Sequence, residues 1–357
     1  MKIHVKPTMS CNLSCYYCNE KRDDKRMSIA TLERIVSLIA EVVHFKHVRR
    51  IEFEWSGGEP LLLGASFFRD AFRFQQEKIR TEVSNTVYSN LLLLDDEMAD
   101  LLSETRVEVY TSLDDLGANS LRRGSSSRYF DLFDARLSLL LSRGLKVKLY
   151  TTVTGQNVAA IRDLYRYANR HGLDFDFSNV QYPFMEPDRR LQELAPEPGE
   201  FEREAIQLFD DWFRSPSRHA VIKPFYAVIR FLVSGTRPKP TALVSFDSDG
   251  RLYLCPFDIS KRSPFCGLAE ISGVDLAELV ARNCCGPTAS RVDCNGCEFK
   301  DFCNWMLCKD RTEGASISAE AQFHNTCRYW KPIFEHIRQQ VISDLTPRRS
   351  EALDAGA

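Results

Sequence analysis

Hydrophobic positions along the first half of the chain alternate between strand-like and helix-like spacing. Short runs rich in β-branched and aromatic residues predict strands at 3–6, 51–55, 85–88, 107–112, 146–152 and 175–180. Hydrophobic positions three and four residues apart predict helices between them, at 29–43 after the N-cap Ser28, and at 66–79, 95–102, 128–142 and 158–170. Each strand–helix unit has about 30 residues, the length of a βαβ crossover. This pattern predicts a parallel sheet curled into a partial or complete barrel, a member of the α/β class.

The pattern changes after residue 185, where several prolines interrupt the alternation. Two helices are predicted next, at 200–214 and 219–232, and a second breaker cluster follows at 235–240. From residue 243 the segments are short and rich in cysteine, so we expect this region to need bound metal to fold. A last helix is predicted at 332–344, with a disordered tail at 347–357. We therefore predict a partial barrel (1–185), a helical bridge (186–240), a small cysteine-rich domain (241–335) and a C-terminal helix end with its tail (336–357).

Length and charge exclude several classes of protein. The 357 residues allow two domains. The chain has 47 Lys and Arg against 49 Asp and Glu, so no strong field of one sign favours nucleic acid or an anionic membrane as the main partner. Apolar runs such as Leu91–Leu94 are far shorter than the ~18 residues that a membrane helix needs. The first residues contain no apolar signal core, so we expect a cytoplasmic protein.

Cysteine is the residue type whose distribution is unusual. There are twelve, with three at positions 11, 15 and 18 and nine between 255 and 327. Without a signal peptide we expect a reducing compartment, which argues against a disulfide framework. Two tight groups of thiols instead predict metal or iron–sulfur ligation.

Cys11, Cys15 and Cys18 form the spacing C-x3-C-x2-C on a loop directly after the first predicted strand. Three thiolates can hold a [4Fe-4S] cluster and leave one iron open to the amino and carboxylate groups of a small molecule. The alternative is a zinc site with a fourth ligand from elsewhere, but His4 is the only nearby histidine and no second cysteine pair is close. The carboxyl end of a barrel strand is where such folds place their chemistry.

Further motifs follow in order, each at the end of a predicted strand. They are WSGGEPLL at 55–62, YSN at 88–90, and SLDD at 112–115 with two arginines downstream. Together with Tyr17, the aromatic residue before the third cysteine, they give residues 1–180 a specific resemblance to the radical S-adenosylmethionine (SAM) enzymes. The resemblance implies a partial (β/α)6 barrel that binds SAM on a [4Fe-4S] cluster and generates a 5′-deoxyadenosyl radical.

The resemblance also implies which residues bind SAM. The expected contacts are Tyr17, Gly57, Gly58, Glu59, Pro60, Ser89, Asn90, Ser112, Arg122 and Arg123. The two glycines would let the backbone approach the ligand closely, and Glu59 would accept hydrogen bonds from the ammonium group. One arginine would pair with the methionine carboxylate, and we favour Arg123. Leu91 and Asp115 stand where the family usually has glycine.

The C-terminal cysteines resemble the SPASM domain, which carries up to two auxiliary [4Fe-4S] clusters. They are Cys255, Cys266, Cys284, Cys285, Cys294, Cys297, Cys303, Cys308 and Cys327. The resemblance assigns one auxiliary cluster to Cys294, Cys297, Cys303 and Cys327. It assigns the other to Cys255 and Cys308, with the remaining ligands among Cys266, Cys284 and Cys285. Two positions depart from the family pattern, because Ser272 replaces a cysteine and four residues rather than three separate Cys303 from Cys308.

The combined resemblance implies a maturase that modifies a ribosomally made precursor peptide. We favour intramolecular crosslinking, through a carbon–carbon cyclophane or a thioether. Peptide epimerisation and sulfatase-type oxidation of Cys or Ser are alternatives, and a zinc-binding interaction protein is an alternative of another class. We expect a monomer that receives electrons from a small protein such as flavodoxin or ferredoxin. Because the first predicted strand begins at residue 3, we also expect no peptide-binding domain ahead of the barrel.

Overall fold

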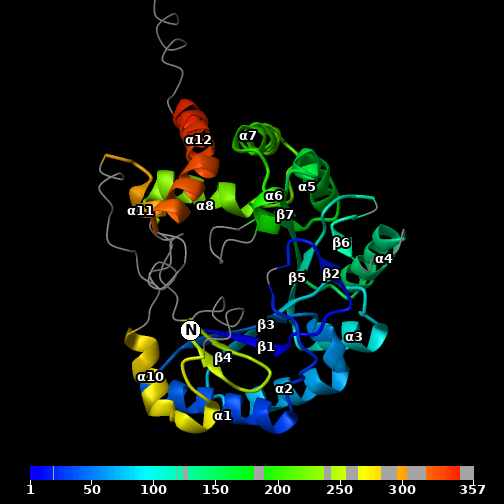
Figure 1. Ribbon diagram of the computed structural model, residues 1–357, viewed down its shortest axis with the longest axis vertical. Helices are drawn as coiled ribbons and strands as arrows, with labels where there is room; N and C mark the ends of the chain where they lie inside the picture. Colours follow the sequence, from blue (N-terminus) through cyan, green and yellow to red (C-terminus); the bar gives the residue numbers. More distant parts are fainter. Residues whose placement is uncertain are drawn as a thin grey trace, which may run out of the picture.

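The computed structural model shows a curved sheet of eight strands with helices on its outer side (Figure 1). It describes residues 1–18, 20–117, 119–123, 128–180, 189–236, 243–254, 264–282, 296–303 and 319–345. The sheet order is β10-β9-β1-β3-β4-β5-β7-β8. The strands are β1 (Lys2–Thr8), β3 (Arg50–Gly57), β4 (Glu82–Tyr88), β5 (Glu108–Ser112), β7 (Val147–Val153), β8 (Asp174–Asn179), β9 (Leu243–Phe246) and β10 (Leu252–Tyr253). A separate pair joins β2 (Ser14–Cys15) to β6 (Arg122–Arg123).

Helices connect the parallel strands as the hydrophobic spacing predicts. They are α1 (Ile29–Lys46), α2 (Gly64–Lys78), α3 (Asp96–Glu104), α4 (Tyr129–Ser142) and α5 (Ile161–Arg170), with 3-10 turns η1 (Pro60–Leu63) and η2 (Val158–Ala160). Later helices are α6 (Arg189–Leu194), α7 (Pro198–Arg214), α8 (Lys223–Ser234), α10 (Gly273–Arg282), α11 (Lys300–Cys303) and α12 (Ala319–Leu345), with η4 (Leu268–Glu270). The predicted N-cap is confirmed, because the Ser28 hydroxyl accepts a hydrogen bond from the Thr31 amide.

Alternation along the strands separates an apolar outer face from a polar inner face. On β7, Leu149 and Val153 are fully buried, whereas Tyr150 and Thr152 are partly exposed and line a cavity. On β3, Phe53 and Trp55 are buried, and the Trp55 ring packs edge-on against Phe68 of α2. The core therefore lies between the sheet and the helices, and the inner face of the sheet remains available for polar side chains.

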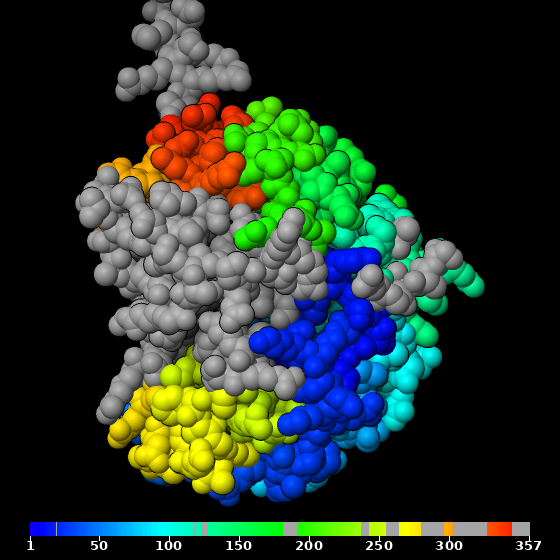
Figure 2. All heavy atoms as spheres, in the orientation of Figure 1, coloured from blue at the N-terminus to red at the C-terminus, as the bar shows by residue number. Residues whose placement is uncertain are grey.

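The start of the predicted cysteine-rich domain belongs to the barrel sheet. Strand β9 pairs in parallel with β1, and β10 pairs antiparallel with β9. The described parts of this region also bury Val244, Phe246 and Leu276, so it holds more apolar packing than the sequence suggested. Figure 2 shows the yellow segment that includes α10 against the blue segment that includes α1, and the two helices are in contact.

The last helix begins at Ala319, not at Pro332 as predicted. Proline is common at the first turn of a helix, which made Pro332 a reasonable start. Here Tyr329, Trp330 and Phe334 are buried on both sides of the proline, and the helix packs against α7 and α8. This packing outweighs the loss of one backbone hydrogen bond. Among the described residues no helix is both long enough and apolar enough to cross a bilayer, and the predicted disordered tail lies outside them.

Candidate active site

A cavity of about 530 Å³ lies at the carboxyl ends of the parallel strands. Its walls come from the cysteine loop after β1 and from the ends of β3, β4, β5, β7 and β8. Eleven of the predicted site residues line it, namely Cys11, Cys15, Cys18, Tyr17, Gly57, Gly58, Glu59, Ser89, Asn90, Ser112 and Arg122. The sheet curvature thus brings together motifs that lie more than a hundred residues apart in sequence.

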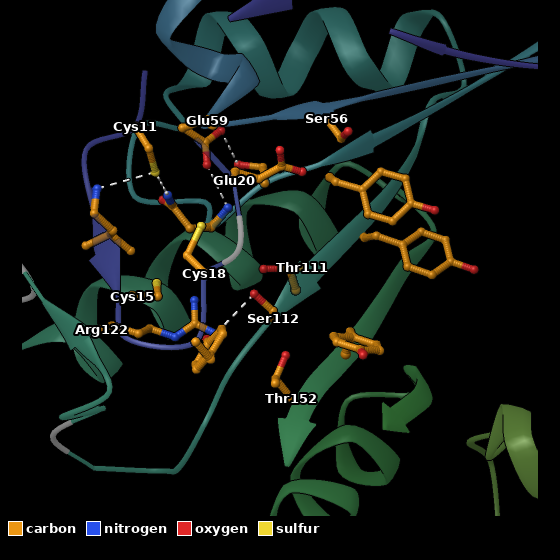
Figure 3. A pocket seen from close by; sticks show the side chains of 18 of the residues that line it. Cys11, Cys15, Cys18, Glu20, Ser56, Glu59, Thr111, Ser112, Arg122 and Thr152 are labelled. Carbon is orange, nitrogen blue, oxygen red and sulfur yellow. Dashed lines mark hydrogen bonds between the residues drawn. The ribbon is translucent and has the colours of Figure 1, made fainter. Parts of the chain in front are cut away.

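The three cysteines of the loop lie at one end of this cavity (Figure 3). All three are partly exposed and none is in a disulfide. Burial raises the pKa of the Cys11 thiol, and it raises that of the Cys15 thiol to about 11. In a [4Fe-4S] cluster each of three thiolates would bind a different iron. The soft sulfur donors and the adjoining cavity therefore fit a [4Fe-4S] cluster with one iron open.

Gly57 and Gly58 are required by the backbone of the cysteine loop. A Cβ atom on Gly58 would lie 1.9 Å from the Ser10 carbonyl oxygen, and one on Gly57 would lie 2.4 Å from that of Thr8. The Gly58 amide donates to the Thr8 carbonyl at 2.9 Å, and Gly57 has a φ of +114°. The glycines thus allow a close approach to the loop that carries the cysteines, and the predicted close approach to a ligand remains a prediction.

Glu59 is buried and joins the end of β3 to the end of β4. Its Oε1 accepts hydrogen bonds from the Ser89 hydroxyl at 2.8 Å and the Leu61 amide at 3.1 Å, and its Oε2 accepts one from the Asn90 amide at 2.8 Å. Burial raises the pKa of Glu59 to about 7, although these hydrogen bonds act in the opposite direction. Pro60 follows as the first residue of η1 and is buried. The predicted contact between Glu59 and the ammonium group of SAM remains a prediction.

Asn90 and Leu91 continue this turn. The side-chain Nδ2 of Asn90 donates to the side-chain oxygen of Asn12 at 2.8 Å, which connects the β4 end to the cysteine loop. Leu91 has a φ of +66° and is fully buried, so this residue keeps the left-handed conformation that glycine adopts easily. The predicted sugar contacts of Ser89 and Asn90 remain predictions.

Of the two adjacent arginines, Arg122 lines the cavity, as does Arg22. Arg122 donates two hydrogen bonds to Asp114, from Nε at 2.9 Å and from Nη2 at 3.0 Å. Its Nη2 also donates to the Ser112 hydroxyl at 3.0 Å (Figure 3). Burial lowers the pKa of Arg122, but the Asp114 carboxylate outweighs this effect and holds it well above its ordinary value. We predicted that Arg123 pairs with the methionine carboxylate of SAM, but its side chain lies outside the described part of the chain. The geometry of the described residues favours Arg122 for this role.

Asp114 is a site residue that the sequence analysis missed. It is completely buried, and besides Arg122 it accepts the hydroxyl of Tyr17 at 2.8 Å and 3.0 Å. The signal was the pair of adjacent aspartates in SLDD, of which we considered only Asp115. Asp115 instead shapes the following turn, because its Oδ1 accepts the Gly117 amide at 2.7 Å.

The far half of the cavity is formed by side chains to which the sequence motifs assigned no role, although Tyr88 begins the YSN motif. Tyr88 and Tyr110 stack with ring centroids 4.9 Å apart, and the Tyr150 hydroxyl is hydrogen-bonded to Ser178. Lys223 of α8 lies 2.9 Å from the Asp176 carboxylate, with the lysine side chain 62% exposed and the aspartate 19%. Burial raises the pKa of Asp176, while Lys223 acts to lower it. Apart from Lys223, which belongs to α8, they are the partly exposed members of alternating strands, and that alternation was the available signal.

Only part of the predicted auxiliary ligand set can be located. Cys266 lies beside β10, since its carbonyl accepts the Leu252 amide at 2.9 Å, and burial raises the pKa of its thiol. Cys297 and Cys327 are partly exposed and not in disulfides, and Cys303 ends α11. Cys255, Cys284, Cys285, Cys294 and Cys308 lie outside the described residues. The auxiliary ligand sets therefore remain predictions.

Comparison with known proteins matches residues 5–168 to the Radical SAM superfamily. The chain is 22% identical over 367 residues to a cysteine-type anaerobic sulfatase-maturating enzyme of Clostridium perfringens, covering 96% of this chain and 98% of that protein. It is 30% identical over 179 residues to an uncharacterized protein of Methanothermobacter thermautotrophicus, covering 49% of this chain and 66% of the relative.

Solved structures share the architecture over most of the chain. The native anSMEcpe structure with bound AdoMet has a TM-score of 0.79 at 20% identity, covering 96% of this chain and 98% of that one. Streptococcus suis SuiB bound to its precursor peptide SuiA has a TM-score of 0.59 at 14% identity, covering 85% and 70% of the two chains. The sheet is open, and the predicted partial barrel is confirmed.

Proposed function

We propose that this chain, which belongs to the radical SAM superfamily and is a radical SAM enzyme, is a maturase that modifies a residue of a ribosomally made peptide or of a protein. The observation that carries the proposal is the continuity of the cavity. One end is lined by Cys11, Cys15 and Cys18, and the other by aromatic side chains and the Asp176–Lys223 pair. A cavity of about 530 Å³ lies within the usual range for small-molecule sites.

The residues around the cysteine loop suit the binding of SAM on its [4Fe-4S] cluster. Bound together, these groups supply hydrogen-atom abstraction from an unactivated carbon. We propose that Arg122 and Ser112, which are hydrogen-bonded to each other and both line the cavity, bind the carboxylate of SAM near the end of β5. Glu59 fixes the turn after β3, whose backbone borders the cavity beside the cysteines. We propose that the C-terminal cysteines hold one or two auxiliary clusters that accept the electron released when a substrate is oxidised.

The far half of the cavity is suited to a side chain of a peptide. The stacked rings of Tyr88 and Tyr110 offer an apolar wall with hydroxyl groups at its edge. The exposed ammonium group of Lys223 offers hydrogen-bond donors to peptide carbonyls. The likeness to sulfatase-maturating enzymes over nearly the whole chain, and to a SuiB structure with its precursor peptide, supports a peptide or protein substrate.

For the reaction we propose intramolecular crosslinking of the peptide, with an aromatic residue as one partner. The aromatic wall at the far end of the cavity favours an aromatic guest. A second candidate is oxidation of a Cys or Ser side chain, and the full-length likeness to sulfatase-maturating enzymes favours it. Epimerisation is a third candidate, because it too begins with abstraction of a hydrogen atom from the peptide.

Mass spectrometry of a treated peptide tests the proposal. The anaerobically reconstituted enzyme would be incubated with SAM, a reductant and, one at a time, each short peptide encoded near its gene. A crosslink removes a pair of hydrogen atoms and suppresses fragmentation between the joined residues. Sulfatase-type oxidation yields an aldehyde that reacts with a hydrazide, and epimerisation leaves the mass unchanged but incorporates solvent deuterium. SAM cleavage that leaves every such peptide unmodified, with a free small molecule consumed instead, would contradict a maturase.

A further inference from the structure

A buried chain of polar contacts connects the cysteine loop to Arg122 of β6. The Tyr17 hydroxyl donates to both oxygens of Asp114, at 2.8 Å and 3.0 Å, and Arg122 donates to the same two oxygens at 3.0 Å and 2.9 Å. The side chains of Arg122 and Asp114 are only 2% and 0% exposed. Tyr17 lies between Cys15 and Cys18, so a single carboxylate joins two parts of the SAM site.

The backbone connects the same two segments. Cys15 pairs directly with Arg122 across the β2–β6 ladder, and the Tyr16 amide donates to the Leu121 carbonyl at 2.9 Å. A displacement of the 121–122 backbone therefore moves the loop that carries the cysteines. Side chains and backbone thus give two independent connections between the thiols and the guanidinium.

A buried ion pair is a poor source of stability, because desolvation of both charges offsets most of their attraction. An apolar pair of similar volume would serve the fold equally well. The Asp114 carboxylate accepts donors from two chain segments, and the guanidinium it orients also lines the cavity. Its geometry serves to fix the position of Arg122 relative to Tyr17.

We propose that Asp114 is a positioning residue that couples the binding of SAM at Arg122 to the retention of iron by the cysteine loop. When the carboxylate of SAM binds Arg122 and orders its side chain, it also orders Asp114, Tyr17 and the cysteine loop. Coupling of this kind is reciprocal, so SAM slows the loss of iron and the loaded loop strengthens the binding of SAM. The inference rests on the radical SAM chemistry alone and does not depend on the proposed peptide substrate.

Two tyrosine variants provide a matched test. Tyr17→Phe removes the hydroxyl that joins Asp114 to the loop, whereas Tyr129→Phe removes a hydroxyl that accepts from Arg122 Nη1 at 3.1 Å and belongs to α4. The reconstituted full chain is mixed with a chelator, and the rate of iron release is measured with and without saturating SAM. SAM affinity is measured separately by equilibrium dialysis.

We expect Tyr17→Phe to release iron about tenfold faster and to lose most of the protection by SAM, the effect of removing one hydrogen bond to a charged group. Tyr129→Phe should keep the iron-release rate and the protection of the natural protein, even if its SAM affinity falls. Asp114→Asn, which keeps the side-chain shape, should resemble Tyr17→Phe. If Tyr17→Phe and Tyr129→Phe release iron equally fast and SAM protects both equally, the proposed coupling is wrong, whatever the fate of Asp114→Asn.

Discussion

Replacing Gly58 with alanine should displace the cysteine loop without changing any ligand of the cluster. The new Cβ would lie 1.9 Å from the Ser10 carbonyl oxygen and 2.7 Å from the Met9 carbonyl carbon. Since Cβ atoms essentially never approach other atoms within 3.0 Å, the loop would have to move by about 1 Å. Two backbone hydrogen bonds hold it in place, from the Gly58 amide to Thr8 at 2.9 Å and from the Glu59 amide to Ser10 at 2.8 Å.

The expected cost follows from these contacts. Each hydrogen bond contributes about 1 kcal/mol, and forcing a methyl group into a filled site costs about 1–3 kcal/mol. The free energy of unfolding should therefore fall by about 3–5 kcal/mol, out of a total of about 5–15 kcal/mol. We expect the variant to lose iron from the SAM-binding cluster and most of its SAM affinity, as measured by iron analysis and equilibrium dialysis after anaerobic reconstitution.

Gly199→Ala is the matched control. Gly199 lies near the start of α7, a Cβ atom added to it would meet no other atom within 4 Å, and its φ is not left-handed. Alanine has the better helix propensity, so this variant should keep its iron and gain up to about 1 kcal/mol. If Gly58→Ala retains the iron content and SAM affinity of the Gly199→Ala protein, the close packing of the glycine turn on the cysteine loop has no functional importance.

Three further predictions concern other groups of the barrel. Lys223→Met should weaken binding of the peptide by about tenfold, as measured by fluorescence anisotropy, and leave SAM binding unchanged; adding Asp176→Asn should restore part of the loss, because it removes the unpaired buried carboxylate. Arg122→Ala should weaken SAM affinity more than Arg123→Ala, in equilibrium dialysis, and the reverse order would restore our first preference. Burial lowers the pKa of His4 to about 3, so only the unfolded chain takes up this proton as the pH falls below 6.5. Stability should then fall by about 1.4 kcal/mol per pH unit between pH 6.5 and about 3, in denaturant unfolding, and His4→Gln should abolish that part of the slope.

The sequence predicted the parts of the fold that local patterns determine. Strand alternation and helical spacing located the parallel strands and α1–α5, because each element buries one face against the same core. The addition of β9 to β1 was not predicted, since a parallel neighbour more than 230 residues away leaves no local signal. Pro332 gave a misleading helix start because packing of Trp330 and Phe334 outweighs the local preference of proline.

The candidate site was predicted to a similar extent. The thiols and the glycine turn were found by motif and lie together in the cavity. The role of the glycines was only partly anticipated, because their contact with Ser10 depends on how the cysteine loop folds back. Asp114 was missed because a buried carboxylate is recognisable only once its partners Tyr17 and Arg122 surround it. Lys223, in the far half of the cavity, was missed because it comes from a helix after the barrel.

The most direct test of the radical SAM assignment compares the full chain with a variant in which Cys11, Cys15 and Cys18 are all alanine. Both proteins are reconstituted anaerobically and reduced, and the electron paramagnetic resonance spectrum is recorded before and after SAM is added. We predict that SAM changes the spectrum of the natural protein and yields 5′-deoxyadenosine, whereas the triple variant shows neither effect and keeps only the iron of its auxiliary clusters. An unaltered response to SAM in the triple variant would contradict the assignment of these three thiols.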